Sequence, residues 1–260
     1  MPRDFGEEGK RLSYGSYLKV PELLRLQVLL SDPPAHDELL FITVHQAYEL
    51  WFKQALFELE SARGWIDRGE ILAARHVLKR VHAIELVMID HIEVLETMSP
   101  QAFLEFRHNL APASGFQSVQ FREIEFLSGL KDERYLERLE MDADERDRLK
   151  RRLDEPTLWD AFCRLLERRG LSMPPDDAVR RAESLLTMAR HPRHLELFAL
   201  SDDLLEHDEQ FSRWRFHHVL MVERQIGTKS GTGGSAGAPY LRTTLDKRFY
   251  PELWDLRSHL

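Results

Sequence analysis

The stretch DELLFITVHQAYELWFKQALFELESARGWID, residues 37–67, decides the fold class of this chain. Its apolar residues recur at intervals of three and four, which is the pattern of an amphipathic helix with one buried face. Residues 70–98 continue the pattern with no glycine or proline between Gly69 and Pro100. We therefore expect two long helices in succession, and a core built from helix packing.

The sequence outside this pair also favours helices. Residues 22–30 repeat apolar residues at helical spacing, and a helix that restarts after the turn at 109–115 is expected to end near Gly129. A further helical pattern runs from Pro192 to about Ile226. Alternating Val, Ile and Thr runs, which indicate strands, are not clustered anywhere in the sequence.

These patterns predict one all-α domain over residues 1–260, a helical bundle. Residues 131–204 begin with a segment that is dense in charge, and we expect them to be a variable helical insertion. Residues 227–238 contain much of the chain's glycine and are expected to be a mobile loop.

Charge and cysteine content narrow the function classes. The 44 acidic residues exceed the 36 basic ones, giving a net charge of −8, which argues against non-specific nucleic-acid binding. The single cysteine, Cys163, cannot form an internal disulfide and fits a reducing compartment, so we expect a cytoplasmic protein. The N-terminus has no apolar signal region, and no apolar run approaches the ~18–20 residues that span a bilayer, so we expect no membrane anchor.

Two adjacent histidines, His217 and His218, cannot face the same way on a helix, because successive residues differ by ~100° in direction. His218 shares its face with apolar residues such as Trp214 and Met221, whereas His217 falls near Arg213. His218 is therefore expected to point inward. It is either a core histidine satisfied by a carbonyl or carboxylate, or a ligand.

His45 lies in an aromatic stripe with Phe41, Tyr48 and Phe52, at spacings that bring these side chains onto one helix face. The stripe is either packed core with a hydrogen-bonded histidine, or the wall of a flat pocket in which His45 makes one of the few polar contacts.

The glycine-rich segment GTKSGTGGSAG, residues 227–237, lacks the GxxxxGK[ST] spacing of a phosphate-binding loop. It is either a flexible linker or a mobile lid whose backbone amides and Thr232 hydroxyl could hold an anion.

Several ordered blocks, covering roughly half the chain, resemble the tryptophan 2,3-dioxygenase family. The matching blocks are LSYGSYL (12–18), HDELLFITVHQAYELWFKQALFELE (36–60), FRHNLAPASGFQSVQFREIE (106–125), HDEQFSRWRFHHVLMVERQIGTKSGTGGSAG (207–237) and PYLRTTLDKRFYPELWDLR (239–257). The resemblance implies an all-α homotetramer with one haem b per chain. It also implies insertion of both atoms of O₂ across the indole 2,3 bond of L-tryptophan, giving N-formyl-L-kynurenine, the first step of the kynurenine pathway.

The resemblance also implies roles for single residues around the haem. His218 matches the axial ligand of the haem iron, and His45 matches the residue that hydrogen-bonds the indole N–H. We expect His45 to position the indole rather than act as an obligatory general base, because the indole N–H is a very weak acid. Phe41 and the following residues, Ile42, Thr43 and Val44, resemble the segment beside the indole.

Other matches concern the amino-acid end of the substrate. Arg107 resembles the residue that clasps the carboxylate, a task suited to a planar guanidinium. Thr232 matches the residue that touches the ammonium and carboxylate, and Ser114 matches a serine near the indole and the haem edge. Phe103 stands where bacterial members commonly carry tyrosine, so carboxylate binding is expected to depend more on Arg107.

The N-terminal segment, residues 1–20, resembles an arm that crosses to a neighbouring chain. Tyr14 and Tyr17 match aromatic residues that cover the neighbour's pocket, although a local helix staple is the alternative. Two other functions stay open from the sequence: a haem or indole sensor without turnover, and a dioxygenase for other indoleamines. The expected partners are L-tryptophan, O₂ and copies of the same chain, with neither nucleic acid nor membrane.

Overall fold

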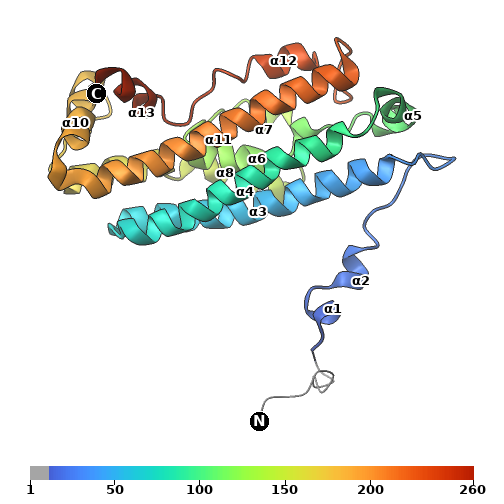
Figure 1. The fold of residues 1–260 in the computed structure, drawn as a ribbon, viewed down its shortest axis with the longest axis horizontal. Helices are drawn as coiled ribbons and strands as arrows, with labels where there is room; N and C mark the ends of the chain where they lie inside the picture. The colour runs from blue at the N-terminus through green and yellow to red at the C-terminus, as the bar shows by residue number, and fades with distance from the viewer. Residues whose placement is uncertain (1–11) are drawn as a thin grey trace.

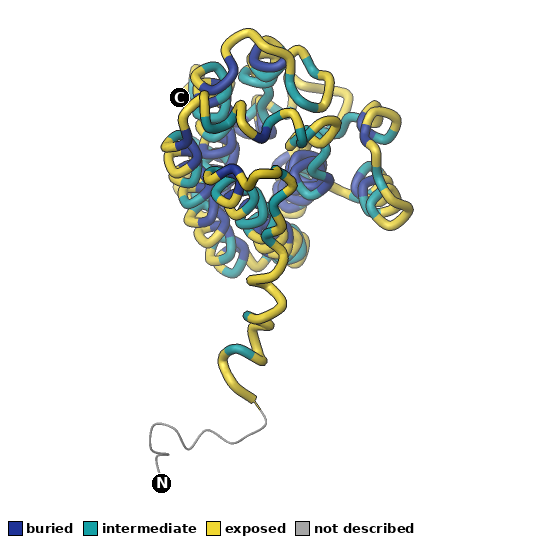
Figure 2. Tube along the Cα trace, turned by 90° about the vertical axis from the view of Figure 1, so that its right-hand side faces the viewer, coloured by how far each residue is buried: buried dark blue, intermediate teal, exposed yellow. Residues whose placement is uncertain are grey.

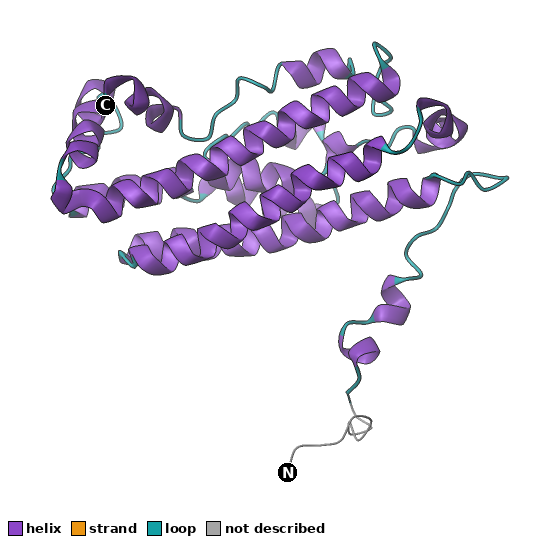
Figure 3. Ribbon diagram, viewed as in Figure 1, coloured by secondary structure: helices purple, strands orange, loops and turns teal. Residues whose placement is uncertain are grey.

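All regular elements in residues 12–260, the part of the chain that the computed structural model describes, are helices (Figure 3). The all-α prediction is confirmed. None of the described helices combines the length and the apolar character that crossing a bilayer requires. The α-helices are α1 (Tyr14–Tyr17), α2 (Val20–Leu23), α3 (Glu38–Arg68), α4 (Ile71–Glu96), α5 (Pro100–Leu110), α6 (Val119–Ser128), α7 (Tyr135–Arg138), α8 (Ala143–Asp154), α9 (Leu158–Arg168), α10 (Ala178–Arg190), α11 (Leu195–Ile226), α12 (Ala238–Arg242) and α13 (Pro251–Leu256).

Helices α3, α4 and α11 form the frame of the molecule (Figure 1). The chain turns from α3 into α4 at Gly69, whose φ of 78° is readily adopted by glycine alone. α11 lies along α4, and their facing side chains, such as Leu78, Val81 and Leu204, are buried. The long apolar patterns at 37–67 and 70–98 are thus explained by burial along nearly the whole length of both helices.

Helix α6 is the most deeply enclosed helix of the described chain, because all of its residues except Gln120 are buried. The Ser118 hydroxyl begins the helix by accepting a hydrogen bond from the Phe121 N–H at 3.2 Å. The helix ends at Gly129, as predicted, with a φ of 133°. A Cβ at position 129 would lie 3.0 Å from the Phe249 carbonyl oxygen, so both conformation and space require glycine there.

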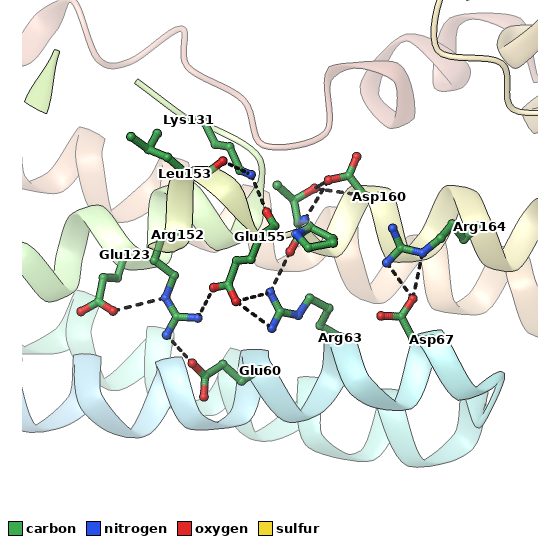
Figure 4. Close-up of polar contacts among 12 residues, drawn as sticks. Glu60, Arg63, Asp67, Glu123, Lys131, Arg152, Leu153, Glu155, Asp160 and Arg164 are labelled. Carbon is green, nitrogen blue, oxygen red and sulfur yellow. Dashed lines mark hydrogen bonds and ion pairs between the residues drawn. The ribbon is translucent and has the colours of Figure 1, made fainter. Parts of the chain in front are cut away.

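Residues 131–204 contain α7 to α10 and the start of α11. α9 packs on the bundle through a buried apolar face, and charged side chains add contacts from both α8 and α9 (Figure 4). Arg152 of α8 is buried and pairs with Glu60 of α3, with Glu123 of α6 at 3.2 Å and with Glu155 at 2.5 Å. The Lys131 ammonium donates to the carbonyl of Leu153 at 2.7 Å at the end of α8. The segment is therefore integrated with the fold, and its variability stays a prediction.

The predicted helix at 22–30 is wrong beyond Leu23, where α2 ends. The Glu38 carboxylate accepts hydrogen bonds from the backbone N–H groups of Leu30 at 2.8 Å and Ser31 at 3.0 Å, which replaces helical bonding there. Most apolar side chains of residues 22–30 are exposed, and the N-terminal part of the described chain extends away from the bundle (Figure 2). The apolar pattern of residues 22–30 therefore does not mark a contact with the core of the same chain.

Candidate functional site

A cavity of about 1230 Å³, counting its open mouth, lies at one end of the bundle. Helices α3, α5, α6 and α11 contribute to its walls, and segment 227–238 closes part of it. The walls are mainly apolar, and the most important polar groups on them are two histidines and three arginines. Such a combination of an apolar pocket with a few convergent polar groups is typical of a ligand site.

His218 faces this cavity from α11 and stacks on Trp214, with ring centroids 4.9 Å apart. Burial, with a smaller contribution from nearby His45, lowers the pKa of His218 to about 4, so its imidazole is neutral at pH 7. It makes no hydrogen bond to another residue in the described part of the chain, which is the pattern of a ligand rather than a satisfied core histidine. His217 does not line the cavity, as the helical wheel predicts.

His45 faces the same cavity from α3. Its Nδ1 lies 2.7 Å from the carbonyl oxygen of Phe41, which can only accept, so Nδ1 carries the proton. Burial lowers the pKa of His45, and the neutral ring therefore keeps its lone pair on Nε2. His45 is arranged to accept one hydrogen bond from a ligand.

An aromatic wall lies beside His45. Phe41 stacks on Phe103 with centroids 5.8 Å apart, and its ring lies 4.0 Å from that of His45. The remainder of the predicted aromatic stripe is core: Tyr48 and Phe52 are buried outside the cavity lining, and the Tyr48 hydroxyl donates to the Met88 carbonyl at 2.7 Å. The flat slot is thus formed between α3 and α5 rather than along α3 alone.

Ile42, Thr43 and Val44 do not line the cavity of this chain. Helix geometry explains why, since Phe41 and His45 lie one turn apart on the cavity face and the three intervening residues point elsewhere. Val44 is buried in the core, and Thr43 is exposed. The sequence-based placement of these three residues beside a substrate is therefore not supported by the geometry of one chain.

Tyr14 and Tyr17 also lie outside the cavity lining. Both belong to the short helix α1, and their exposed fractions of 79% and 71% show that neither packs against the chain's own core. Residues 1–11 of the predicted N-terminal arm lie outside the described residues.

Arg107, Ser114 and Thr232 meet where segment 227–238 closes the cavity. The Arg107 guanidinium donates to the Ser230 carbonyl, and the Thr232 hydroxyl donates to the Ala113 carbonyl at 2.6 Å. A Cβ on Gly233 would lie 2.6 Å from the Ser114 Cβ, so glycine is required for this close approach. The segment is thus held against α5 and the 111–118 turn by the same side chains that are candidates for binding an amino acid.

A buried charge network in the cavity wall was not predicted from the sequence. Glu125 of α6 pairs with Arg122 at 2.5 Å and with Arg215 of α11 at 3.0 Å. With Arg107, the described lining thus has three arginines and a single carboxylate. The signal was present in the sequence, because charged residues inside a helix that is otherwise apolar require a partner or a ligand.

These groups fit a haem. His218 offers a neutral nitrogen donor without a competing hydrogen bond, the walls include apolar side chains such as Phe121 and Met221, and the surplus of arginine suits anionic side groups. The fold and the cavity define a helical protein whose buried pocket can hold a flat, largely apolar cofactor with carboxylate arms.

Comparison with known proteins identifies the family. The family model described as "Tryptophan 2,3-dioxygenase" matches residues 2–174 and 168–260. The tryptophan 2,3-dioxygenase of Nocardioides sp. is 57% identical, over 98% of this chain and 97% of its own. That of Herpetosiphon aurantiacus is 42% identical (96% and 98%), and that of Serratia proteamaculans 40% (96% and 94%). The chain belongs to the tryptophan 2,3-dioxygenase family, and the resemblance noted in its sequence is confirmed.

Proposed function

We propose that this chain is a haem-dependent dioxygenase that inserts both atoms of O₂ across the indole 2,3 bond of L-tryptophan, giving N-formyl-L-kynurenine at the start of the kynurenine pathway. One observation carries the proposal: His45 and His218, from two different helices, border a single cavity, and both are neutral. Membership of the family favours this enzyme over a haem or indole sensor.

Haem b, one per chain, is the cofactor of this proposal. His218 would ligate the haem iron, while Arg122 would bind a carboxylate arm. When bound, the haem supplies the redox-active iron at which dioxygen is activated. The chain's own part is to position this group in a dry, mainly apolar pocket.

The substrate's indole would lie beside His45. The unprotonated Nε2 of His45 accepts the indole N–H, which fixes the orientation of the ring without removing its proton. Phe41 and Phe103 provide aromatic contact with the indole, and Ser114 lies at the edge of the slot. Because Phe103 lacks a hydroxyl, it cannot contribute a polar contact to the carboxylate.

The amino-acid end of the substrate would be held by Arg107 and Thr232. Arg107 exchanges the Ser230 carbonyl for the substrate carboxylate, a stronger acceptor because it is charged. Thr232 exchanges the Ala113 carbonyl for the carboxylate and ammonium groups. Segment 227–238 would then order over the bound substrate as a lid and exclude water.

The proposal includes a cytoplasmic homotetramer in which the N-terminal arm crosses to a neighbour. Its support is the row of exposed apolar side chains directly after that arm, at Leu24, Leu26 and Val28, which have no packing partner in their own chain's core. Tyr14 and Tyr17 would complete each pocket only in the assembly.

The test is the absorption spectrum of the purified, reduced protein, followed by turnover of L-tryptophan in the presence of O₂. A Soret band and accumulation of the formylated product are expected. His218→Ala should lose haem binding or iron ligation, whereas the matched control His217→Ala should leave the spectrum nearly unchanged. Equal loss in both variants would contradict the assignment.

A second measurement separates the enzyme from its alternatives. Arg107→Leu should lower kcat/KM for L-tryptophan, because it removes a bidentate charge contact. The expected loss of transition-state stabilisation is about 2–5 kcal/mol. Tryptamine, which has no carboxylate, should be a poor substrate for the wild type and insensitive to this substitution. Efficient oxidation of tryptamine would favour a dioxygenase for other indoleamines, and haem binding without turnover would favour a sensor.

A further inference from the structure

A second histidine of α11, His207, is completely buried outside the cavity. Its Nδ1 lies 2.5 Å from a carboxyl oxygen of Glu85 on α4, and its Nε2 lies 2.8 Å from the hydroxyl of Ser128 on α6. One imidazole thus joins three helices, each of which also contributes residues to the cavity wall.

The network is held by hydrogen bonds rather than by an ion pair. Burial raises the pKa of the Glu85 carboxyl well above its ordinary range and lowers the pKa of His207 to about 4, so both shifts favour the neutral forms of the pair. Apolar side chains of similar size would stabilise such a core at least as well. What the hydrogen bonds add is direction, since they are satisfied in only one relative arrangement of the helices.

The next residue fixes α11 from another side. The Asp208 carboxylate accepts hydrogen bonds from the backbone N–H groups of Phe249 at 2.8 Å and Tyr250 at 3.0 Å, and from the Trp254 indole at 2.9 Å. Successive helical residues differ by ~100° in direction, so the side chains of His207 and Asp208 leave α11 in different directions. Their contacts therefore hold the helix from two sides. Together they leave the helix little freedom to rotate.

We propose that His207 is a positioning residue that sets the rotation of α11 relative to α4 and α6, and thereby the direction in which His218 enters the cavity. His207 and His218 are eleven residues apart, which is about three turns, and they lie on nearly the same face of the helix. The inference rests on the proposed function, because the direction of His218 matters only if the imidazole ligates a haem.

The test uses the haem-loaded protein in its reduced form, with two readouts besides activity: the iron–histidine stretching band in the resonance Raman spectrum, and the rate of hemin release. His207→Leu should shift the band and speed hemin release about tenfold, the low end of the effect of groups that orient a metal ligand. Glu85→Gln keeps a hydrogen-bonding partner for Nδ1 and should retain the wild-type values.

Asp203→Asn is the matched control, because Asp203 also links α11 to α4, through Arg75 at 2.5 Å, but makes no hydrogen bond or ion pair to α6 within the described residues. It should lower the thermal unfolding midpoint and leave both readouts unchanged. If His207→Leu does not fold, Ser128→Ala removes one of the two hydrogen bonds and should give a smaller shift in the same direction.

Two failures are distinguishable. The positioning role is overturned if His207→Leu and Ser128→Ala lower the unfolding midpoint but leave the band and the hemin release rate at wild-type values. A wild-type chain that does not bind hemin through His218 overturns the proposed function, and the positioning role with it.

Discussion

Two charge networks flank helix α6, and they differ in charge balance. On the outer side, Glu60, Glu123 and Glu155 pair with Arg63 and Arg152 (Figure 4). Arg148 also pairs with Glu123, so this network is matched within the described chain. On the cavity side, Glu125 alone balances Arg122 and Arg215, while Arg107 has no carboxylate partner among residues 12–260.

The difference separates a structural network from a binding one. Burying a charge costs several kcal/mol unless a counter-charge lies close by. The outer network meets that requirement with its own side chains and fastens α8 to α3 and α6. The cavity network leaves positive charge in excess, which an anionic ligand would neutralise. Charge balance thus predicts which of the two networks a ligand completes.

Of substitutions in the two networks, Arg152→Met should cause the largest loss of stability. Removing this buried guanidinium leaves Glu123 and its neighbours without their main counter-charge, so the free energy of unfolding should fall by about 3–5 kcal/mol. Urea denaturation of the haem-free chain measures this. Arg148→Met is the matched control: its side chain is 41% exposed and lies 3.4 Å from Glu123, so it should cost about 1 kcal/mol or less. Equal losses would remove the distinction between the buried and the exposed partner.

Arg122→Leu should lower hemin affinity more than it lowers stability. In the haem-free chain Glu125 keeps Arg215 as its partner, so the loss of stability should be smaller than for Arg152→Met. Hemin affinity should fall about tenfold to a hundredfold, because an arm of the cofactor loses its cation. Titration of the apoprotein with hemin measures this, and Arg152→Met serves as the control with near wild-type affinity. Unchanged affinity in Arg122→Leu would mean that the excess charge serves another purpose.

Much of the fold could be predicted from periodicity because its helices bury one continuous face. The patterns at 37–67, 70–98 and 192–226 correspond to α3, α4 and α11 within a few residues. The pattern at 22–30 has the same spacing but no core to pack on in its own chain, and local periodicity cannot report what lies opposite a face. The error therefore occurs where the apolar face has no partner within the chain.

The cavity was only half predictable for a related reason. His218 and His45 could be found because each lies on an apolar face, where a polar group requires an explanation. Arg122, Glu125 and Arg215 form one network from two helices that are far apart in sequence, and their pairing depends on tertiary contact. Ile42, Thr43 and Val44 were assigned by resemblance alone. They lie within one helical turn between Phe41 and His45, so their side chains point away from the cavity.

Gly237→Ala should disturb the rim of the cavity without changing either charge network. Gly237 has a φ of 70°, and a Cβ there would lie 2.4 Å from the Lys229 carbonyl oxygen, so alanine must displace segment 227–238. Strain of about 1–2 kcal/mol should raise KM for L-tryptophan about tenfold while leaving hemin affinity unchanged. Gly234 also has a positive φ, of 77°, but its Cβ would meet no atom within 4 Å. Gly234→Ala therefore controls for backbone strain without the clash.

The smallest expected effect is the acid response of the outer network, through Glu155. Burial alone would raise the pKa of this carboxyl, but the hydrogen bonds and charges of Arg152 and Arg63 lower it more, so the folded pKa lies below the unfolded value of 4.5. A depressed folded pKa means that the stabilisation is present above about pH 4.5 and is lost as the pH falls through the folded pKa. Glu155→Gln should therefore cost about 1 kcal/mol or less at pH 7, and the difference from wild type should shrink toward pH 3 in urea denaturation. A constant difference across that range would show that the carboxylate's charge contributes nothing, and that the outer network is held by packing and by its other pairs.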